Sequence, residues 1–386
     1  MTIRVLTNIG ELITNDPSLG DGSKMGRITN AALVFDDERV LWAGPSSASV
    51  NGDETIDLHG AAVIPGFVDS HTHLVFAGER SDEFEARMKG ERYDGGGIMR
   101  TVRATRAASD EELRKLTYKR ARELQAGGVT TMEVKSGYAL DPSGEERLVR
   151  IAAEFTDEVT FLGAHVVPAE FQDNREAYVD QVLRMLQSNQ GRARWADVFC
   201  DRGAFSVEEA RRILSYAREL GYELRLHGNQ LGDTGGVGLA VELDCASVDH
   251  CTYVNDDDVK RLASSQTVAT LLPGAEFCTG SPYPSARRLL DAGVTVALAT
   301  DCNPGTSYVT SMSFVIALAV REMGMSVDEA LWAGTMGGAR ALRRSDIGHL
   351  GVGARADFVV LDAPRAAHLA YRPGTSLISQ THRASR

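Results

Sequence analysis

Two histidines separated by one residue, His71 and His73, close an apolar run early in the chain. In an extended strand, side chains at positions i and i+2 point to the same face, so both imidazoles could bind one metal ion. His227, His250 and Asp301 end later apolar runs in the same way. Each of these residues alone is better explained as a hydrogen-bonded core histidine or a capping aspartate. Together the five side chains predict a metal centre.

Histidine nitrogens and a carboxylate are typical ligands of a borderline cation such as zinc or iron. Three histidines and one aspartate leave a coordination position for water, which indicates hydrolysis. A second ion would need a bridging group at the end of the fourth apolar run, where the chain has Cys200 and Asp201. Lys135 ends the second run, too far around to bridge, and is expected to be a solvated or structural lysine. We therefore predict one metal ion, Zn²⁺ or Fe²⁺/Fe³⁺.

The elements that must position these residues are β-type runs that alternate with helical patterns, as in a parallel α/β sheet or barrel. The eight runs are residues 63–73, 129–135, 159–165, 195–201, 223–227, 245–250, 267–272 and 294–301. Between them, signals such as the capping box of Ser206 with Glu209 mark helix starts. Eight parallel strands close a (β/α)8 TIM barrel, whose catalytic groups lie at the C-terminal ends of the strands.

The two ends of the chain have a different pattern from the middle. Short β-type runs broken by Gly, Asp, Asn and Ser clusters fill the N-terminal part, and one more strand follows a glycine turn near the C-terminal end. We expect an α/β fold in which residues 63–349 form the barrel. Residues 1–62 and 350–386 are expected to form a second, small β-sandwich-like domain.

Composition excludes several classes of protein. Of 386 residues, 43% are hydrophobic and 24% are charged, which is typical of an ordinary globular protein and not of a disordered chain. A net charge of −12 repels phosphate backbones and anionic lipids, so neither nucleic acid nor membrane is an expected partner. Glu11 lies where the apolar core of a signal peptide would have to continue. No apolar run approaches the roughly 18 residues of a membrane span.

Five cysteines are scattered along the chain without a CxxC pair, which favours reduced thiols and a cytoplasmic protein. They are Cys200, Cys245, Cys251, Cys278 and Cys302.

Several segments resemble the amidohydrolase superfamily, and the resemblance extends over nearly the whole chain. The resemblance rests on the PGFVDSHTH motif that starts at Pro65, and on the positions of His227, His250 and Asp301. Within that superfamily, five segments are similar to the imidazolonepropionase family: HTHLVFAGER from His71, EVKSGY from Glu133, GAH from Gly163, TLLPGAE from Thr270 and ATDCNPGT from Ala299. The resemblance implies that water opens the ring of 4-imidazolone-5-propanoate to give N-formimidoyl-L-glutamate in histidine degradation. It also suggests a homodimer that acts on this small molecule.

The resemblance implies roles for individual residues. The implied metal ligands are His71, His73, His227 and Asp301. The implied substrate contacts are Arg80, Tyr138, His165, Asn303, Gly305 and Thr306. An arginine can bind a carboxylate through two parallel hydrogen bonds, so Arg80 is the expected clamp for the propanoate. A solvated Arg80, a packing Tyr138 and a structural His165 are the alternatives.

One position departs from the family pattern. Many members have an acid three residues after the histidine that corresponds to His227, whereas this chain has Gln230, which hydrogen-bonds but cannot act as a base. We expect Gln230 to contact the substrate, and the proton transfer to fall on Asp301 and His250. Asp301 would take a proton from water and return it to the leaving nitrogen, while His250 would stabilise the oxyanion.

Two other functions are left open. A deaminase of a purine or pyrimidine ring uses similar ligands, although Arg80 and Tyr138 favour a substrate with a carboxylate. A non-catalytic, metal-free scaffold of the same fold is the second alternative. Such a scaffold is expected to have lost ligands, and this chain keeps them.

Overall fold

The computed structural model describes residues 2–48, 51–90 and 97–385. The chain forms two compact units. Unit 1 comprises Met1–Asp69, Glu123–Thr131 and Ser311–Arg386, and unit 2 comprises Ser70–Arg122 and Met132–Thr310. The predicted domain boundaries after residues 62 and 349 stay a prediction.

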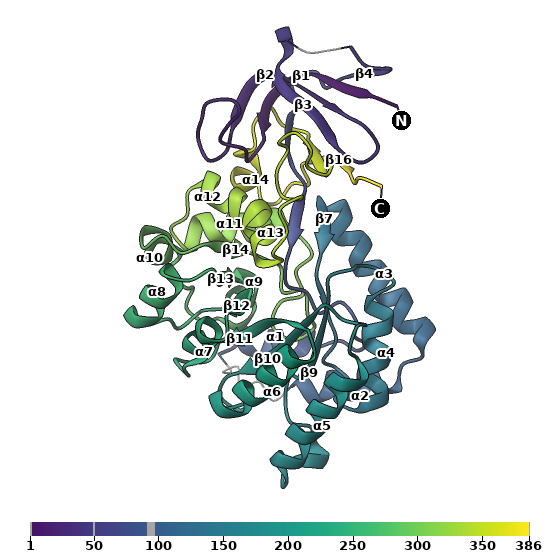
Figure 1. Ribbon diagram of the computed structural model, residues 1–386, viewed down its shortest axis with the longest axis vertical. Helices are drawn as coiled ribbons and strands as arrows, with labels where there is room; N and C mark the ends of the chain where they lie inside the picture. Colours follow the sequence, from purple (N-terminus) through teal and green to yellow (C-terminus); the bar gives the residue numbers. More distant parts are fainter. Residues whose placement is uncertain (1, 49–50, 91–96, 386) are drawn as a thin grey trace. The chain divides into compact units, whose positions relative to one another are not determined.

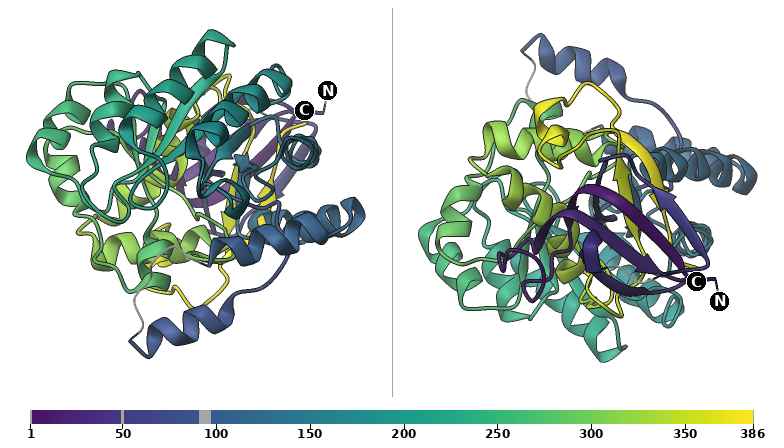
Figure 2. Two further views of the ribbon diagram at one scale, coloured as in Figure 1. Left: turned by 90° about the horizontal axis from the view of Figure 1, so that it is seen from below. Right: turned by 90° about the horizontal axis from the view of Figure 1, so that it is seen from above.

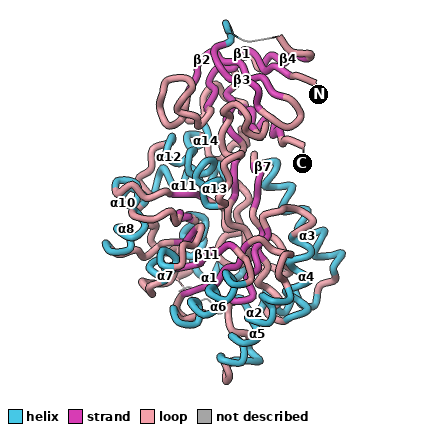
Figure 3. The backbone as a smooth tube through the Cα atoms, in the orientation of Figure 1, coloured by secondary structure: helices cyan, strands magenta, loops and turns pink. Residues whose placement is uncertain are grey.

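Unit 1 contains a mixed seven-stranded sheet built from both ends of the chain (Figure 3). Its strand order is β16 (Ile378–His382), β15 (Phe358–Leu361), β5 (Ala62–Pro65), β1 (Arg4–Ile13), β2 (Arg27–Phe35) and β3 (Val40–Pro45), with β4 (Glu54–Asp57) paired to β1. Antiparallel pairing of β15 with β5 confirms that the C-terminal strand completes the N-terminal sheet. Phe35 and Phe358 pack edge to face in its core, with ring centroids 5.0 Å apart.

The predicted run 63–73 is two strands in the structure. It divides at Gly66 into β5 and β6 (Phe67–Asp69), and β6 pairs with β7 (Val129–Met132). A Cβ at Gly66 would lie 2.2 Å from the Thr130 hydroxyl oxygen, so the close approach of the backbone requires glycine. The helices of unit 1 are α11 (Met312–Glu322), α12 (Val327–Trp332), α13 (Gly338–Ala341) and α14 (His368–Tyr371).

Unit 2 contains a parallel sheet whose strands follow one another in chain order (Figure 1). They are β8 (Val134–Lys135), β9 (Val159–Ala164), β10 (Trp195–Cys200), β11 (Glu223–Gly228), β12 (Ser247–His250), β13 (Val268–Leu271) and β14 (Val296–Leu298). The segment with the histidine pair lies between the two ends of this sheet. The amide of Lys135 donates to the Thr72 carbonyl at 2.9 Å, and Thr72 forms a parallel bridge with Cys302. These bonds close the predicted (β/α)8 barrel.

Helices alternate with the strands of unit 2 and lie outside them (Figure 2). They are α1 (Ser81–Met88), α2 (Ile98–Ala107), α3 (Asp110–Ala126), α4 (Pro142–Ala152), α5 (Arg175–Ser188), α6 (Val207–Glu219), α7 (Gly236–Glu242), α8 (Asp256–Ala263), α9 (Pro273–Thr279) and α10 (Ala286–Asp291). The predicted capping box is present, since Ser206 and Glu209 exchange hydrogen bonds at the start of α6. None of the helices in the described ranges is both long and apolar enough to cross a bilayer.

Candidate active site

Four buried side chains of unit 2, from the segments that follow β6 and β14 and from the end of β11, lie close together. His73 Nε2 lies 3.3 Å from His71 Nε2 and 3.4 Å from His227 Nε2. Asp301 Oδ1 lies 3.5 Å from Nε2 of both His71 and His73. Ligand atoms about 2.0–2.1 Å from a tetrahedral ion stand roughly 3.3–3.4 Å apart. The donor spacing therefore fits a single metal ion.

Two buried aspartates orient the rings of this centre. Asp249 Oδ2 lies 2.7 Å from His71 Nδ1, and Asp197 lies 3.0 Å from His227 Nδ1. An ionised carboxylate only accepts, so each Nδ1 carries the hydrogen and each Nε2 presents its lone pair to the centre. Burial holds the pKa of His71 well below its usual value, which keeps this ring neutral, the form that binds a metal.

A buried network of charges supports the two aspartates. Lys135 Nζ donates to Glu133 and to Asp197, both at 2.9 Å, and Arg225 lies 3.3 Å from Asp249. The structure therefore selects the structural alternative predicted for Lys135, buried instead of solvated. Sequence reasoning did not identify Asp197 and Asp249. The signal that could have identified them is a single aspartate inside an otherwise apolar strand.

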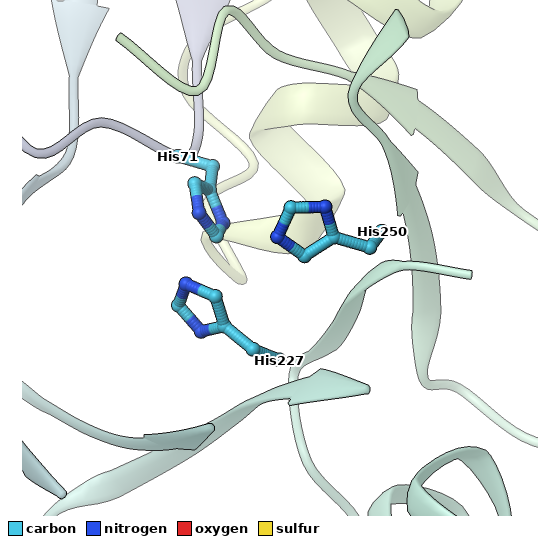
Figure 4. A group of neighbouring side chains, drawn as sticks. All are labelled: His71, His227 and His250. Carbon is cyan, nitrogen blue, oxygen red and sulfur yellow. The ribbon is translucent and has the colours of Figure 1, made fainter. Parts of the chain in front are cut away.

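His250 lies beside this centre on β12. Its ring centroid is 5.8 Å from that of His71 and 5.5 Å from that of His227, and the three rings turn toward a shared space (Figure 4). His250 has a φ of +80° and Cys251 a φ of +53°, a left-handed conformation that is strained for residues with a side chain. His250 Nδ1 is buried without a hydrogen-bond partner among the described residues.

A cavity of about 220 Å³ opens onto His73, His227, His250 and Asp301. All of the predicted substrate-contacting residues line it: Arg80, Tyr138, His165, Gln230, Asn303, Gly305 and Thr306. Apolar residues also line the cavity: Ile98, Met99, Val166, Val167, Phe199 and Leu231. The structure therefore brings the predicted substrate-contacting residues into one cavity with three of the four predicted metal ligands, His73, His227 and Asp301.

Arg80 is buried and ion-paired, not solvated. Its Nε and Nη2 donate to the two carboxylate oxygens of Glu83 at 2.8 and 2.6 Å. Arg87, one turn after Glu83 on α1, has its Nη2 3.3 Å from the same carboxylate. A Cβ at Gly305 would lie 2.4 Å from Arg80 Nη1, so the guanidinium runs along the backbone of Gly305. Sequence reasoning missed Glu83.

The loop after β14 is held by its own asparagine. Asn303 Oδ1 accepts hydrogen bonds from the amides of Gly305 and Thr306, both at 2.8 Å, and its Nδ2 donates to the Asp301 carbonyl at 2.7 Å. The backbone N–H groups of Gly305 and Thr306 are thus used within the turn, as is common where an asparagine starts a turn.

His165 and Tyr138 form an aromatic wall beside His73. The rings of His165 and His73 are stacked with centroids 5.4 Å apart, and Tyr138 tilts against His165 at 5.3 Å. His165 Nδ1 lies 3.0 Å from the carbonyl oxygen of Gly137. Burial lowers the pKa of His165 to about 3, so its ring is neutral and donates from Nδ1.

Gln230 is positioned through its backbone. The amides of Gln230 and Leu231 donate to Asp201 Oδ2 at 2.6 and 2.9 Å, which fixes the turn after β11. Asp201 is thus bound to the backbone amides of this turn.

Glu276, on α9, is a further buried carboxyl that sequence reasoning did not assign. Its Oε1 accepts the Thr252 hydroxyl at 2.6 Å, while Oε2 has no hydrogen-bond partner among the described residues. Burial raises the pKa of Glu276 to about 7, more than its hydrogen bond from Thr252 lowers it.

Comparison with known proteins identifies the family. Residues 62–381 match the model of the amidohydrolase family. The chain is 56% identical to an imidazolonepropionase from Streptomyces griseus, over 100% of this chain and 99% of that protein. It is 58% identical to one from Salinispora arenicola, with 98% and 97% covered.

Solved structures of lower identity share the fold. A triazine hydrolase variant superposes with a TM-score of 0.74 at 19% identity, covering 98% of this chain and 93% of that one. An adenosine deaminase from Xanthomonas campestris with bound zinc gives 0.72 at 17% identity, with 99% and 91% covered.

Proposed function

This chain belongs to the imidazolonepropionase family of the amidohydrolases, and from that premise we propose that its site opens the ring of 4-imidazolone-5-propanoate with water. The observation that carries this proposal is the spacing of the histidine Nε2 atoms, which is the spacing expected around one metal ion. These histidines lie at the cavity that Arg80 also lines, and the guanidinium of Arg80 is suited to binding a carboxylate. The product would be N-formimidoyl-L-glutamate, formed by cleavage of the ring amide bond.

We propose that His71, His73, His227 and Asp301 hold zinc or iron. When bound, such an ion would acidify a water molecule and polarise the ring carbonyl. The carboxylates of Asp197 and Asp249 keep the rings in the tautomer that this requires. Elemental analysis of protein purified without added metal distinguishes zinc from iron.

Asp301 is the proposed proton carrier. Its Oδ1 faces the histidine nitrogens, while Oδ2 lies 3.5 Å from the Thr306 hydroxyl in a carboxylate that lines the cavity. One oxygen can therefore bind the metal while the other takes a proton from the attacking water and gives it to the leaving ring nitrogen. His250, a neutral buried imidazole, would donate a hydrogen bond to the oxyanion that develops on the ring carbonyl.

Gln230, Tyr138 and His165 are proposed to orient the ring. Gln230 has an amide that both donates and accepts, so it can hold the ring without carrying a proton. The neutral imidazole of His165 presents an acceptor nitrogen, because its other nitrogen donates to the Gly137 carbonyl. The propanoate would meet Arg80 beside Gly305, where Nη1 runs along the backbone.

The test is incubation of the protein with enzymatically generated 4-imidazolone-5-propanoate, with the product followed by mass. The expected result is gain of one water, loss of imidazolone absorbance, and loss of activity after chelation that returns with metal. Release of ammonia from nucleobases without ring opening would instead support a deaminase. Absence of bound metal and of turnover would support a scaffold.

We also propose that the enzyme is a cytoplasmic homodimer. All five cysteines are free thiols in the structure, as a reducing compartment would maintain them. Light scattering of the metal-loaded protein measures the mass, and a monomer would contradict the proposed dimer.

A further inference from the structure

Arg202 brings a second guanidinium to the catalytic cavity. It lies in the turn between β10 and α6 and lines the same cavity as His227 and Gln230. Its side chain is exposed. Within the described part of the chain, no ion pair or hydrogen bond engages its guanidinium.

Arg202 differs in this respect from two neighbouring arginines of unit 2, Arg80 and Arg175. Arg80, the other guanidinium that lines the cavity, is bound to Glu83. Arg175, which begins α5, is bound to Glu209 at 2.9 Å. A guanidinium with no carboxylate of its own is available to a carboxylate that arrives from solvent.

The nearest acid in sequence is committed elsewhere. Asp201 Oδ1 accepts the amide hydrogen of Arg202 at 2.7 Å, and its Oδ2 accepts the amides of Gln230 and Leu231. Both oxygens of this carboxylate therefore serve the backbone, not the guanidinium beside them.

The guanidinium is also held in place. A Cβ at Gly232 would lie 2.6 Å from Arg202 Cζ and Nη2 and 2.8 Å from Nε, so the side chain packs against the backbone of this glycine. Contact along the whole group restricts its orientation at the rim of the cavity. An oriented guanidinium loses less freedom on binding a carboxylate than a freely moving one.

We propose that Arg202 captures the carboxylate of the substrate at the cavity opening and hands it on to the inner site. This inference rests on the proposed function, because it requires an anionic substrate. The chain carries a net charge of −12, which repels such a substrate at long range. A cation placed in the cleft reverses that field locally and raises the rate of productive encounter, and salt screens this effect.

The experiment measures kcat and kcat/KM of the metal-loaded enzyme across ionic strength. Arg202→Gln is expected to lower kcat/KM by about 5- to 20-fold at low salt, with kcat within about twofold and the deficit shrinking as salt is added. Arg202→Lys should keep most of the activity, and Arg202→Glu should lose more than the glutamine variant. Arg184→Gln is the matched control, because Arg184 is exposed on α5, does not line the cavity, and changes the net charge equally.

Equal behaviour of Arg202→Gln and Arg184→Gln, or a deficit that does not depend on salt, would overturn the role of Arg202. A wild-type enzyme that fails to open the imidazolone ring overturns the proposed function instead. Binding of glutarate, measured by calorimetry on the same proteins, then decides the inference alone. Weaker binding to Arg202→Gln than to Arg184→Gln supports capture of a carboxylate, and equal binding contradicts it.

Discussion

Charges beneath the histidines and charges beside the predicted recognition residues are stabilised in different ways. The metal-side network (Glu133, Lys135, Asp197, Arg225 and Asp249) is almost fully buried and each cation is bonded to a carboxylate. In the recognition-side cluster (Arg80, Glu83 and Arg87), the Glu83 side chain is 25% exposed. Metal ligands must keep one orientation, whereas recognition groups must exchange partners with a substrate.

This difference implies distinct costs of substitution. Removing one partner from the metal-side network leaves a buried charge uncompensated, which is strongly destabilising. In the recognition-side cluster, the Glu83 side chain is partly exposed and Arg80 lines the cavity, so the cost of removing Glu83 is expected to be smaller. Variants of the metal-side network should therefore lose bound metal, whereas variants of the recognition-side cluster should raise KM.

The largest effect is expected for Asp301→Asn, which keeps the shape of the ligand but removes its capacity to accept a proton. We expect kcat to fall by about 10³-fold or more, since acid–base roles contribute about 10²–10⁴-fold and a metal ligand is altered as well. Circular dichroism checks that the fold is retained. Residual kcat above about a tenth of wild type would reassign the base to another residue.

The next effect concerns Glu276, a buried carboxyl outside the metal-side network. Below pH 4.5, Glu276 is protonated in both the folded and the unfolded chain. Between 4.5 and about 7 only the unfolded chain releases the proton, so the stability of the folded state falls as pH rises, and above about 7 the loss is constant. The slope is at most about 1.4 kcal/mol per pH unit.

Glu276→Gln removes this titration. The gain in thermal midpoint of Glu276→Gln over wild type should grow from pH 4.5 to 7 and then level off, measured on chelated protein so that metal does not contribute. Glu208→Gln, an exposed position on α6, is the control and should show no such growth. A gain that is the same at every pH would mean that Glu276 is ionised throughout.

Asp197→Asn tests the metal-side network directly. Substitution of a residue that orients a metal-binding histidine typically costs about 10- to 100-fold in metal affinity or activity. We expect chelator competition to show a loss of this size for Asp197→Asn, because both His227 and Lys135 lose a charged partner. Asp233→Asn, an exposed position, should retain wild-type affinity. Unchanged affinity in both variants would contradict the supporting role of the network.

The sequence indicated the proposed metal ligands but not the residues of the metal-side network that support them. His71, His73, His227, His250 and Asp301 are readable because each ends an apolar run, and parallel strands bring such ends together. Asp197 and Asp249 lie inside runs, where the pattern gives no sign of which distant ring each will contact. Their partners are set by how the strands are arranged around the folded barrel, because Asp249 on β12 contacts His71 while Asp197 on β10 contacts His227 on β11.

The break at Gly66 and the pairing of Arg80 were not predictable for related reasons. A close contact between Gly66 and Thr130 depends on two segments far apart in sequence. The bond between Arg80 and Glu83 is local, but the segment is dense in both signs of charge, so several partners were equally suitable. In both cases the missing information is which groups lie together once the strands and loops have packed.

The smallest effect is expected for Glu83→Gln, on the recognition side. The amide replaces one charged acceptor of Arg80, so the guanidinium is held less firmly while Arg87 stays nearby. Hydrogen bonds to charged groups contribute about 1.5–3 kcal/mol, reduced here by the partial exposure of Glu83. We expect KM to rise about 10-fold, equivalent to about 1.4 kcal/mol, with kcat and metal content unchanged. Glu85→Gln, on the same helix but exposed, is the matched control. A fall in metal content in Glu83→Gln would mean that the recognition-side cluster and the metal-side network are coupled, which would contradict their proposed separate roles.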